Sequence, residues 1–137
     1  MSNIKPIFYE NLKEVNKEFF SEFKEAFDSF LNSGWYILGE NVGTFEKSFA
    51  VFNNSNFTVG VASGLDALHL AINALNLDRG SEIIVPSNTY IATILAIINN
   101  GHIPVMVEPD IKTYNIDPDL IVAKITKKTK AIIVVHL

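Results

Sequence analysis

Four short apolar runs in the second part of the chain constrain the fold more than any other feature. They lie at 57–62, 82–86, 103–107 and 131–135, and helix-like segments separate them. The runs "IIV", "VMV" and "AIIVV" are continuously apolar, which is typical of parallel strands that are buried on both faces. Because parallel strands are joined by crossover helices, this alternation predicts an α/β fold with βαβ units and a mostly parallel sheet.

The first part of the chain instead has the apolar periodicity of helices. Over 11–31 an apolar residue recurs every three or four positions, which places one apolar stripe on an amphipathic helix. Gly34 suits the left-handed geometry of a helix end, and the phenylalanines of 45–52 predict a second, shorter helix. We therefore predict a helical segment over 1–56 and an α/β domain over 57–137.

Composition excludes several classes of protein. The 137 residues carry a formal net charge of −4, so the chain has no basic footprint for nucleic acid. Without cysteine there is no disulfide, thiolate nucleophile or cysteine–zinc site, and a cytoplasmic location is expected. No apolar run approaches the roughly 18 residues of a membrane span. The three histidines follow no ligand spacing, so neither a metal site nor a membrane partner is expected.

The stretch "GVASGLDALHLA" at 60–71 takes the chain from an apolar run into a helix through Ser63 and Gly64. Ser63 can cap this helix, and Asp66 can reach back to the Ser63 amide in a variant of the capping box. Alternatively, the first amides of the helix, those of Gly64, Leu65 and Asp66, can bind a phosphate. The residues alone leave both interpretations open.

The next junction of strand and helix, "IIVPSNTYIATILAI", offers an aromatic group. Pro86 ends the strand, Ser87 or Asn88 can cap the following helix, and Tyr90 is expected in its first turn. Tyr90 either packs into the core with its hydroxyl at the rim or faces the ligand crevice beyond the carboxyl ends of the strands. An anion nest beside an aromatic ring suggests a planar, phosphorylated ligand.

These motifs occur together in one known family. "GWYILG", "FEKSFA", "GVASGLDALHLA", "IIVPSNTYIATILAI", "VEPDIKTYNIDP" and "KAIIVVHL", in this order, closely resemble the amino-terminal part of the DegT/StrS sugar aminotransferases. The resemblance covers essentially the whole chain. It implies a fold-type-I pyridoxal-phosphate enzyme whose large domain has three αβα layers, and it implies a homodimer.

The resemblance also implies roles for particular residues. The helix start receives the phosphate of pyridoxal 5'-phosphate, a role that carries over to the amides of Leu65 and Asp66, with Gly64 allowing close approach. Many relatives have threonine at the position of Leu65, so the hydroxyl contact is absent here. Tyr90 corresponds to the aromatic residue that stacks on the pyridine ring. Tyr36 is a candidate substrate contact, with packing at the dimer interface as the alternative.

The reaction implied is amination of a nucleotide-linked keto sugar in deoxyamino-sugar biosynthesis. The chain looks most like the branch that acts on carbon 3 of a dTDP-linked 3-keto-6-deoxyhexose, with glutamate as amino donor. Relatives carry the lysine that binds the cofactor covalently, and an Asp-x-x-Gln segment, beyond the position of Leu137. No catalytic residue is therefore assigned here, and the chain is expected to be an amino-terminal fragment that is inactive alone.

The sequence leaves two other hypotheses of function open. One is a non-enzymatic relative that keeps the cofactor nest as a sensor or an interaction module. The other is an unrelated α/β nucleotide-binding domain, which the lack of a G-x-G-x-x-G or Walker lysine motif disfavours.

Overall fold

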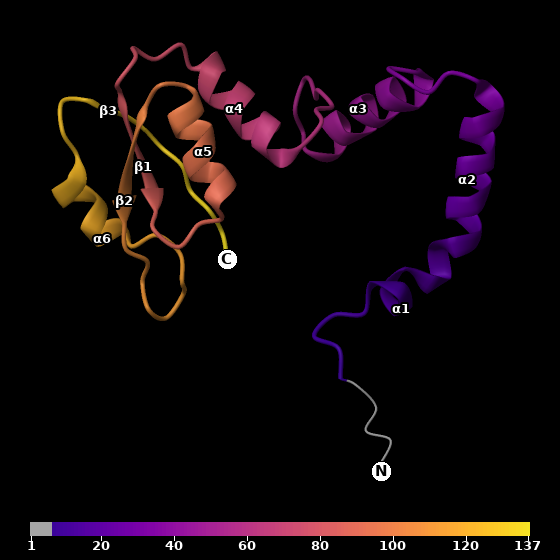
Figure 1. The fold of residues 1–137 in the computed structure, drawn as a ribbon, viewed down its shortest axis with the longest axis horizontal. Helices are drawn as coiled ribbons and strands as arrows, with labels where there is room; N and C mark the ends of the chain where they lie inside the picture. The colour runs from indigo at the N-terminus through magenta and orange to yellow at the C-terminus, as the bar shows by residue number, and fades with distance from the viewer. Residues whose placement is uncertain (1–6) are drawn as a thin grey trace. The chain divides into compact units, whose positions relative to one another are not determined.

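The computed structural model describes residues 7–137, and the chain divides at Gly60 into two compact units. The first unit, Met1–Gly60, is helical where it is described, and the second unit, Val61–Leu137, contains the sheet (Figure 1). The finer assignment of 1–56 and 57–137 as domains stays a prediction.

The first unit consists of helices joined by short turns. Its elements are α1 (Leu12–Asn16), the 3-10 turn η1 (Lys17–Phe19), α2 (Phe20–Ser33) and α3 (Glu40–Phe52). The single helix predicted over 11–31 is thus interrupted. At the interruption the side chain of Asn16 donates to the Leu12 carbonyl, at 2.9 Å, and such local bonds compete with the helical ladder. The predicted end at Gly34 is confirmed, since its φ is 64°.

The second unit is built on a three-stranded parallel sheet, as the apolar runs predict. The strands are β1 (Glu82–Pro86), β2 (Ile103–Val107) and β3 (Thr129–Ile132), in the order β2-β1-β3. Glu82 lies opposite Ile103 on one side and Thr129 on the other. With β1 in the middle, its carboxyl end faces the loops where ligands bind in open α/β sheets.

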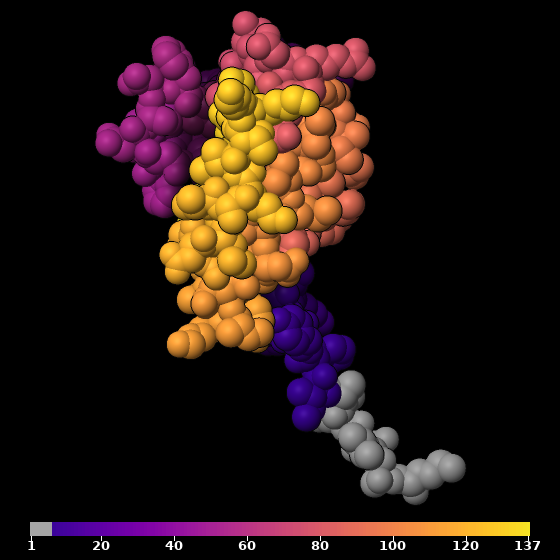
Figure 2. Space-filling view, turned by 90° about the vertical axis from the view of Figure 1, so that its left-hand side faces the viewer, coloured from indigo at the N-terminus to yellow at the C-terminus, as the bar shows by residue number. Residues whose placement is uncertain are grey.

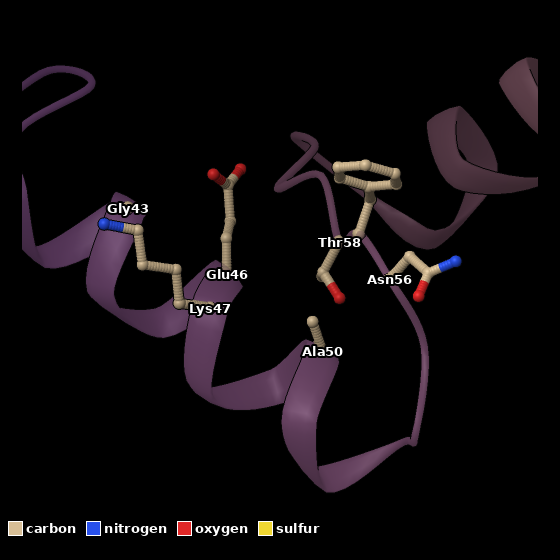
Figure 3. Close-up of a pocket in the computed structure, with 7 residues that line it drawn as sticks. Gly43, Glu46, Lys47, Ala50, Asn56 and Thr58 are labelled. Carbon is tan, nitrogen blue, oxygen red and sulfur yellow. The ribbon is translucent and has the colours of Figure 1, made fainter.

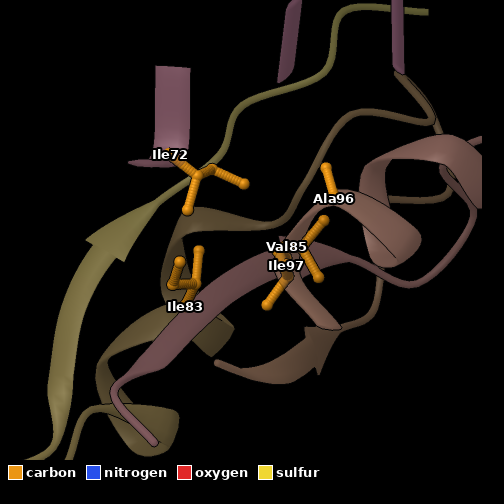
Figure 4. Packing of buried hydrophobic residues seen from close by; sticks show 5 residues of the cluster. All are labelled: Ile72, Ile83, Val85, Ala96 and Ile97. Atoms are coloured by element: carbon orange, nitrogen blue, oxygen red, sulfur yellow. The ribbon is translucent and has the colours of Figure 1, made fainter. Parts of the chain in front are cut away.

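Both faces of β1 are buried, because its side chains alternate between two apolar clusters. On one face Ile83 and Val85 pack with residues of α4 (Gly64–Ala74) and α5 (Ile91–Asn99), and Figure 4 shows this cluster. On the other face Ile84 packs with Val107 and Ile116, and Ile121 of α6 (Pro118–Ile121) covers them. The expected layers of helix, sheet and helix are therefore present.

Two strand predictions differ from the structure. No strand forms at 57–62, where Phe57 is 86% and Val59 is 74% exposed. A strand needs a hydrogen-bonding partner, and among the described residues 57–62 pairs with no strand of the sheet. The strand predicted at 131–135 is β3, which begins two residues earlier and ends at Ile132. The Ile133 amide donates to the Ile84 carbonyl at 2.8 Å and extends the ladder by one residue.

Two glycine turns and a helix cap fix the connections of the second unit. Gly80 and Gly101 have φ values of 81° and 77°, which glycine adopts at no steric cost. Asp117 caps α6 by accepting the Asp119 N–H at 2.9 Å, with Pro118 in the first helical position. Among the helices of residues 7–137, none combines the length and the apolar character needed to cross a membrane.

Candidate functional site

A cleft of the second unit lies beside the carboxyl edge of its sheet and has a volume of about 850 Å³. Its walls come from the amino-terminal turns of α4 and α5 and from Val135 and Leu137 near the chain end. Figure 2 shows this last segment, in yellow, lying over the surface of the second unit. Three predicted site residues, Gly64, Leu65 and Tyr90, line this one cleft.

The start of α4 is fixed by Ser63. Its hydroxyl oxygen accepts the Asp66 N–H at 3.2 Å and lies 2.8 Å from Asp66 Oδ2, to which the hydroxyl donates. The capping interpretation is therefore confirmed, although the Asp66 carboxylate binds the Ser63 hydroxyl and not the Ser63 amide. The hydroxyl hydrogen rotates freely to reach this acceptor.

The same cap decides which amides remain for a ligand. In the described chain the N–H groups of Gly64 and Leu65 have no hydrogen-bond acceptor, as expected for the first turn of a helix. The Asp66 N–H, which the resemblance assigns to the phosphate, is already bound to Ser63. Two free amides at the positive end of the α4 dipole can hold one anionic oxygen group.

Tyr90 lies directly before α5 and not inside its first turn as predicted. It occupies the N-cap position with φ −60° and ψ 141°, and its side chain is 78% exposed. Ser87 and Asn88, the predicted caps, lie in the turn before it. The Tyr90 carbonyl accepts the Thr93 N–H at 3.0 Å. An exposed ring on the wall of an apolar cleft can stack on a planar ligand.

Sequence reasoning missed the contacts that polar residues make around Tyr90. Thr89 and Thr93 bring their hydroxyl oxygens within 2.9 Å of each other, and Asn88 Nδ2 donates to the Tyr114 carbonyl at 3.0 Å. The pattern "PSNTY" contains these residues, but nothing in it indicates that Asn88 reaches a loop 26 positions away.

The loop at 108–117, between β2 and α6, is closed by its own hydrogen bonds. Asp110 Oδ1 accepts the N–H groups of Lys112 and Thr113, both at 2.9 Å. These two backbone donors stabilise the ionised form and hold the pKa of Asp110 below its ordinary value. An isolated bridge between Pro109 and Ile116 closes the base of the loop.

Tyr36 belongs to the first unit, and the cleft belongs to the second. Its hydroxyl donates to the Leu31 carbonyl at 2.9 Å, and its ring lies 5.0 Å from that of Phe30. Both contacts pack Tyr36 against the carboxyl-terminal end of α2. The role of Tyr36 as a substrate contact stays a prediction.

The first unit also contains a smaller pocket, of about 230 Å³, between α3 and the segment that follows it (Figure 3). Glu46 is held there, because its Oε1 accepts the Gly60 N–H at 2.7 Å. No predicted site residue lines this pocket. Within residues 7–137, no group of three histidine or carboxylate side chains is placed to hold a metal ion.

Comparison with known proteins decides the family. Residues 18–137 match the profile of the DegT/DnrJ/EryC1/StrS aminotransferase family. The chain belongs to this family. This aminotransferase-family chain is 55% identical over 127 residues to dTDP-3-amino-3,6-dideoxy-alpha-D-galactopyranose transaminase of Aneurinibacillus thermoaerophilus. It is 42% identical over the same length to the erythromycin biosynthesis sensory transduction protein EryC1 of Saccharopolyspora erythraea. Each alignment covers 93% of the chain but 35% of the relative, so the chain spans about a third of these proteins.

Solved structures of the family confirm the α/β fold. The DesV structure of S. venezuelae, in complex with a ketimine intermediate, superposes with a TM-score of 0.87 at 42% identity. That match covers 93% of this chain and 34% of DesV. The NtdA structure of Bacillus subtilis, with bound cofactor PMP, superposes with a TM-score of 0.84 at 28% identity and covers 99% of the chain and 32% of NtdA.

Proposed function

We propose that this chain supplies the phosphate and ring contacts for pyridoxal 5'-phosphate in an enzyme that aminates a nucleotide-linked keto sugar. The observation that carries the proposal is the cleft itself, in which two free amides and an exposed tyrosine ring line one apolar space. The identity of the cofactor is supported by the family and by the NtdA structure, which holds the amine form of the same cofactor.

The residues of the cleft fit this group in charge and in shape. The N–H groups of Gly64 and Leu65 donate to phosphate oxygens at the positive end of α4, where an anion is stabilised. The ring of Tyr90 offers a flat apolar face for a pyridine ring. Aliphatic side chains on the remaining wall, among them Leu68 and Leu95, exclude water.

When bound, pyridoxal 5'-phosphate supplies an electron sink for amino transfer. This chain contributes binding and orientation, because the lysine that the resemblance requires lies in a segment of the relatives that the chain does not span. The proposed activity is that of a protein containing this chain with the rest of the family fold. We propose dTDP-3-keto-6-deoxyhexose as its substrate, glutamate as donor, and a homodimer in the cytoplasm. The Aneurinibacillus relative, a 3-amino sugar transaminase, supports the choice of sugar.

The test is an amination assay on the complete protein. With cofactor, glutamate and a dTDP-linked 3-keto-6-deoxyhexose, we expect 2-oxoglutarate to form, and we expect much slower formation with the 4-keto isomer. Tyr90→Ala is expected to lower the rate and the cofactor affinity together. Cofactor binding without amination of any keto sugar would instead favour the second candidate, a sensor, for which the name of the EryC1 relative is the specific support.

A further inference from the structure

The two residues before Tyr90 are tied by their side chains to different parts of the second unit. Thr89 Oγ1 lies 2.9 Å from Thr93 Oγ1, one turn into α5, and Thr93 is buried. Asn88 Nδ2 donates to the Tyr114 carbonyl at 3.0 Å, in the loop that follows β2. The backbone that carries Tyr90 is therefore anchored on two sides.

The acceptor that Asn88 reaches is itself fixed. Tyr114 has a φ of 59°, in the left-handed region, and its N–H donates to the Asp110 carbonyl at 2.8 Å. The bridge between Pro109 and Ile116 closes the same loop at its base. Because a residue other than glycine keeps a positive φ only where its surroundings enforce it, the Tyr114 carbonyl is a rigid partner.

Within residues 7–137 the Tyr90 side chain has no hydrogen-bond partner that would orient its ring. Its side chain forms no capping hydrogen bond and is mostly exposed. The direction of the ring therefore follows the backbone of 88–90, whose freedom the Asn88 bond reduces.

We propose that Asn88 is a positioning residue, which holds the ring of Tyr90 at the angle at which it stacks on the cofactor ring through its bond to the Tyr114 carbonyl. This inference rests on the proposed function of Tyr90. Asn88 acts through the backbone and touches neither the cofactor nor the substrate. It joins the loop after β1 to the loop after β2, so the shape of the second loop determines the angle of the ring.

The test separates ring binding from phosphate binding. The full chain is titrated with pyridoxal 5'-phosphate and, separately, with inorganic phosphate. Asn88→Ala is expected to weaken binding of pyridoxal 5'-phosphate roughly fivefold, within the energy of one aromatic stacking contact. Binding of inorganic phosphate is expected to stay unchanged, because it uses the amides of Gly64 and Leu65. The control Thr126→Ala removes a 2.6 Å bond to Glu82 at the opposite edge of the sheet and is expected to change neither affinity.

An equal loss of affinity for both ligands, or no loss for pyridoxal 5'-phosphate, overturns the inference. If the wild-type chain binds neither ligand, the proposed function fails, and amide hydrogen exchange in the unloaded chain then decides the role of Asn88. Faster exchange at Ile91 and Ala92 in Asn88→Ala than in Thr126→Ala supports the positioning role. Identical rates in the two variants overturn it.

Discussion

Ser63 accepts two backbone N–H groups, that of Asp66 through its hydroxyl and that of Ala67 through its carbonyl. Its hydroxyl also donates to the Asp66 carboxylate. The cap was predictable, because serine followed three residues later by an acid is a local signal. The group that the Asp66 carboxylate binds was not predictable. It depends on side-chain torsions, which the spacing of residues in the sequence does not determine.

Ser63→Ala is expected to lower the free energy of unfolding by about 1 kcal/mol, the usual cost of removing an N-cap side chain. The quantity to measure is the urea midpoint at constant m-value. Ser63→Thr keeps the acceptor and is the matched control, with an expected loss of no more than about 0.5 kcal/mol. Equal losses in the two variants would show that the hydroxyl does not stabilise α4.

Asp110 predicts a pH dependence of stability. Its pKa is lowered in the folded chain by the N–H groups of Thr113 and Lys112, so its ionised form favours folding above the ordinary value of 3.8. This contribution is lost as the pH falls through the lower, folded pKa. Asp110→Asn is therefore expected to be less stable than wild type at pH 7, and the difference is expected to shrink below pH ~4. Unfolding midpoints across this range provide the measurement. A difference that does not change with pH would contradict the assignment.

Among helices and strands, the sequence predicts those that are defined by local signals or by a buried apolar run. The strands at 82–86 and 103–107 are confirmed to the residue, because both are apolar runs bounded by turn signals. The run at 57–62 has equal β character, yet no strand forms, since pairing depends on a neighbour that composition does not reveal. The break in the first helix was missed because the apolar stripe continues across it.

The packing of α5 gives a prediction with an internal control. Ile97 is fully buried against β1, while the next residue, Ile98, is 50% exposed. Ile97→Ala is expected to lower the free energy of unfolding by about 3 kcal/mol, since the removed atoms leave a cavity. Ile98→Ala, the same change of side chain on the same helix, is expected to cost less than about 1 kcal/mol. Similar costs in chemical denaturation would contradict the burial of this face.

At the scale of the whole molecule, the chain consists of two units with unequal burial. The second unit contains two apolar clusters, whereas Ala50 is the one residue of the described helices of the first unit that is buried. Along α2, Phe23 and Phe27 of the apolar stripe are 55% and 58% exposed. The amphipathic pattern of this helix was predictable from its own residues. The surface that covers its apolar face was not, because that surface is formed by residues outside the helix.

Exposure of this stripe leads us to expect association of the chain. Sedimentation equilibrium is expected to give a mass above the 15.2 kDa of one chain. Replacing both phenylalanines, in the double variant Phe23→Ser and Phe27→Ser, is expected to weaken association by at least about tenfold, given the apolar area of each side chain. Val122→Ser, an exposed position in the second unit, is the control and is expected to have no effect. A wild-type chain that stays monomeric would contradict this expectation.

The place at which the cofactor binds can be mapped by titrating the isotope-labelled chain with pyridoxal 5'-phosphate and following the backbone amide resonances. We expect the amide resonances of Gly64 and Leu65 to shift most and inorganic phosphate to reproduce these shifts. The Tyr90 amide is expected to respond only to the ligand with a ring. Shifts confined to the pocket beside α3, or shifts at 88–93 without any at Gly64, would contradict the assignment of the cleft as the cofactor site.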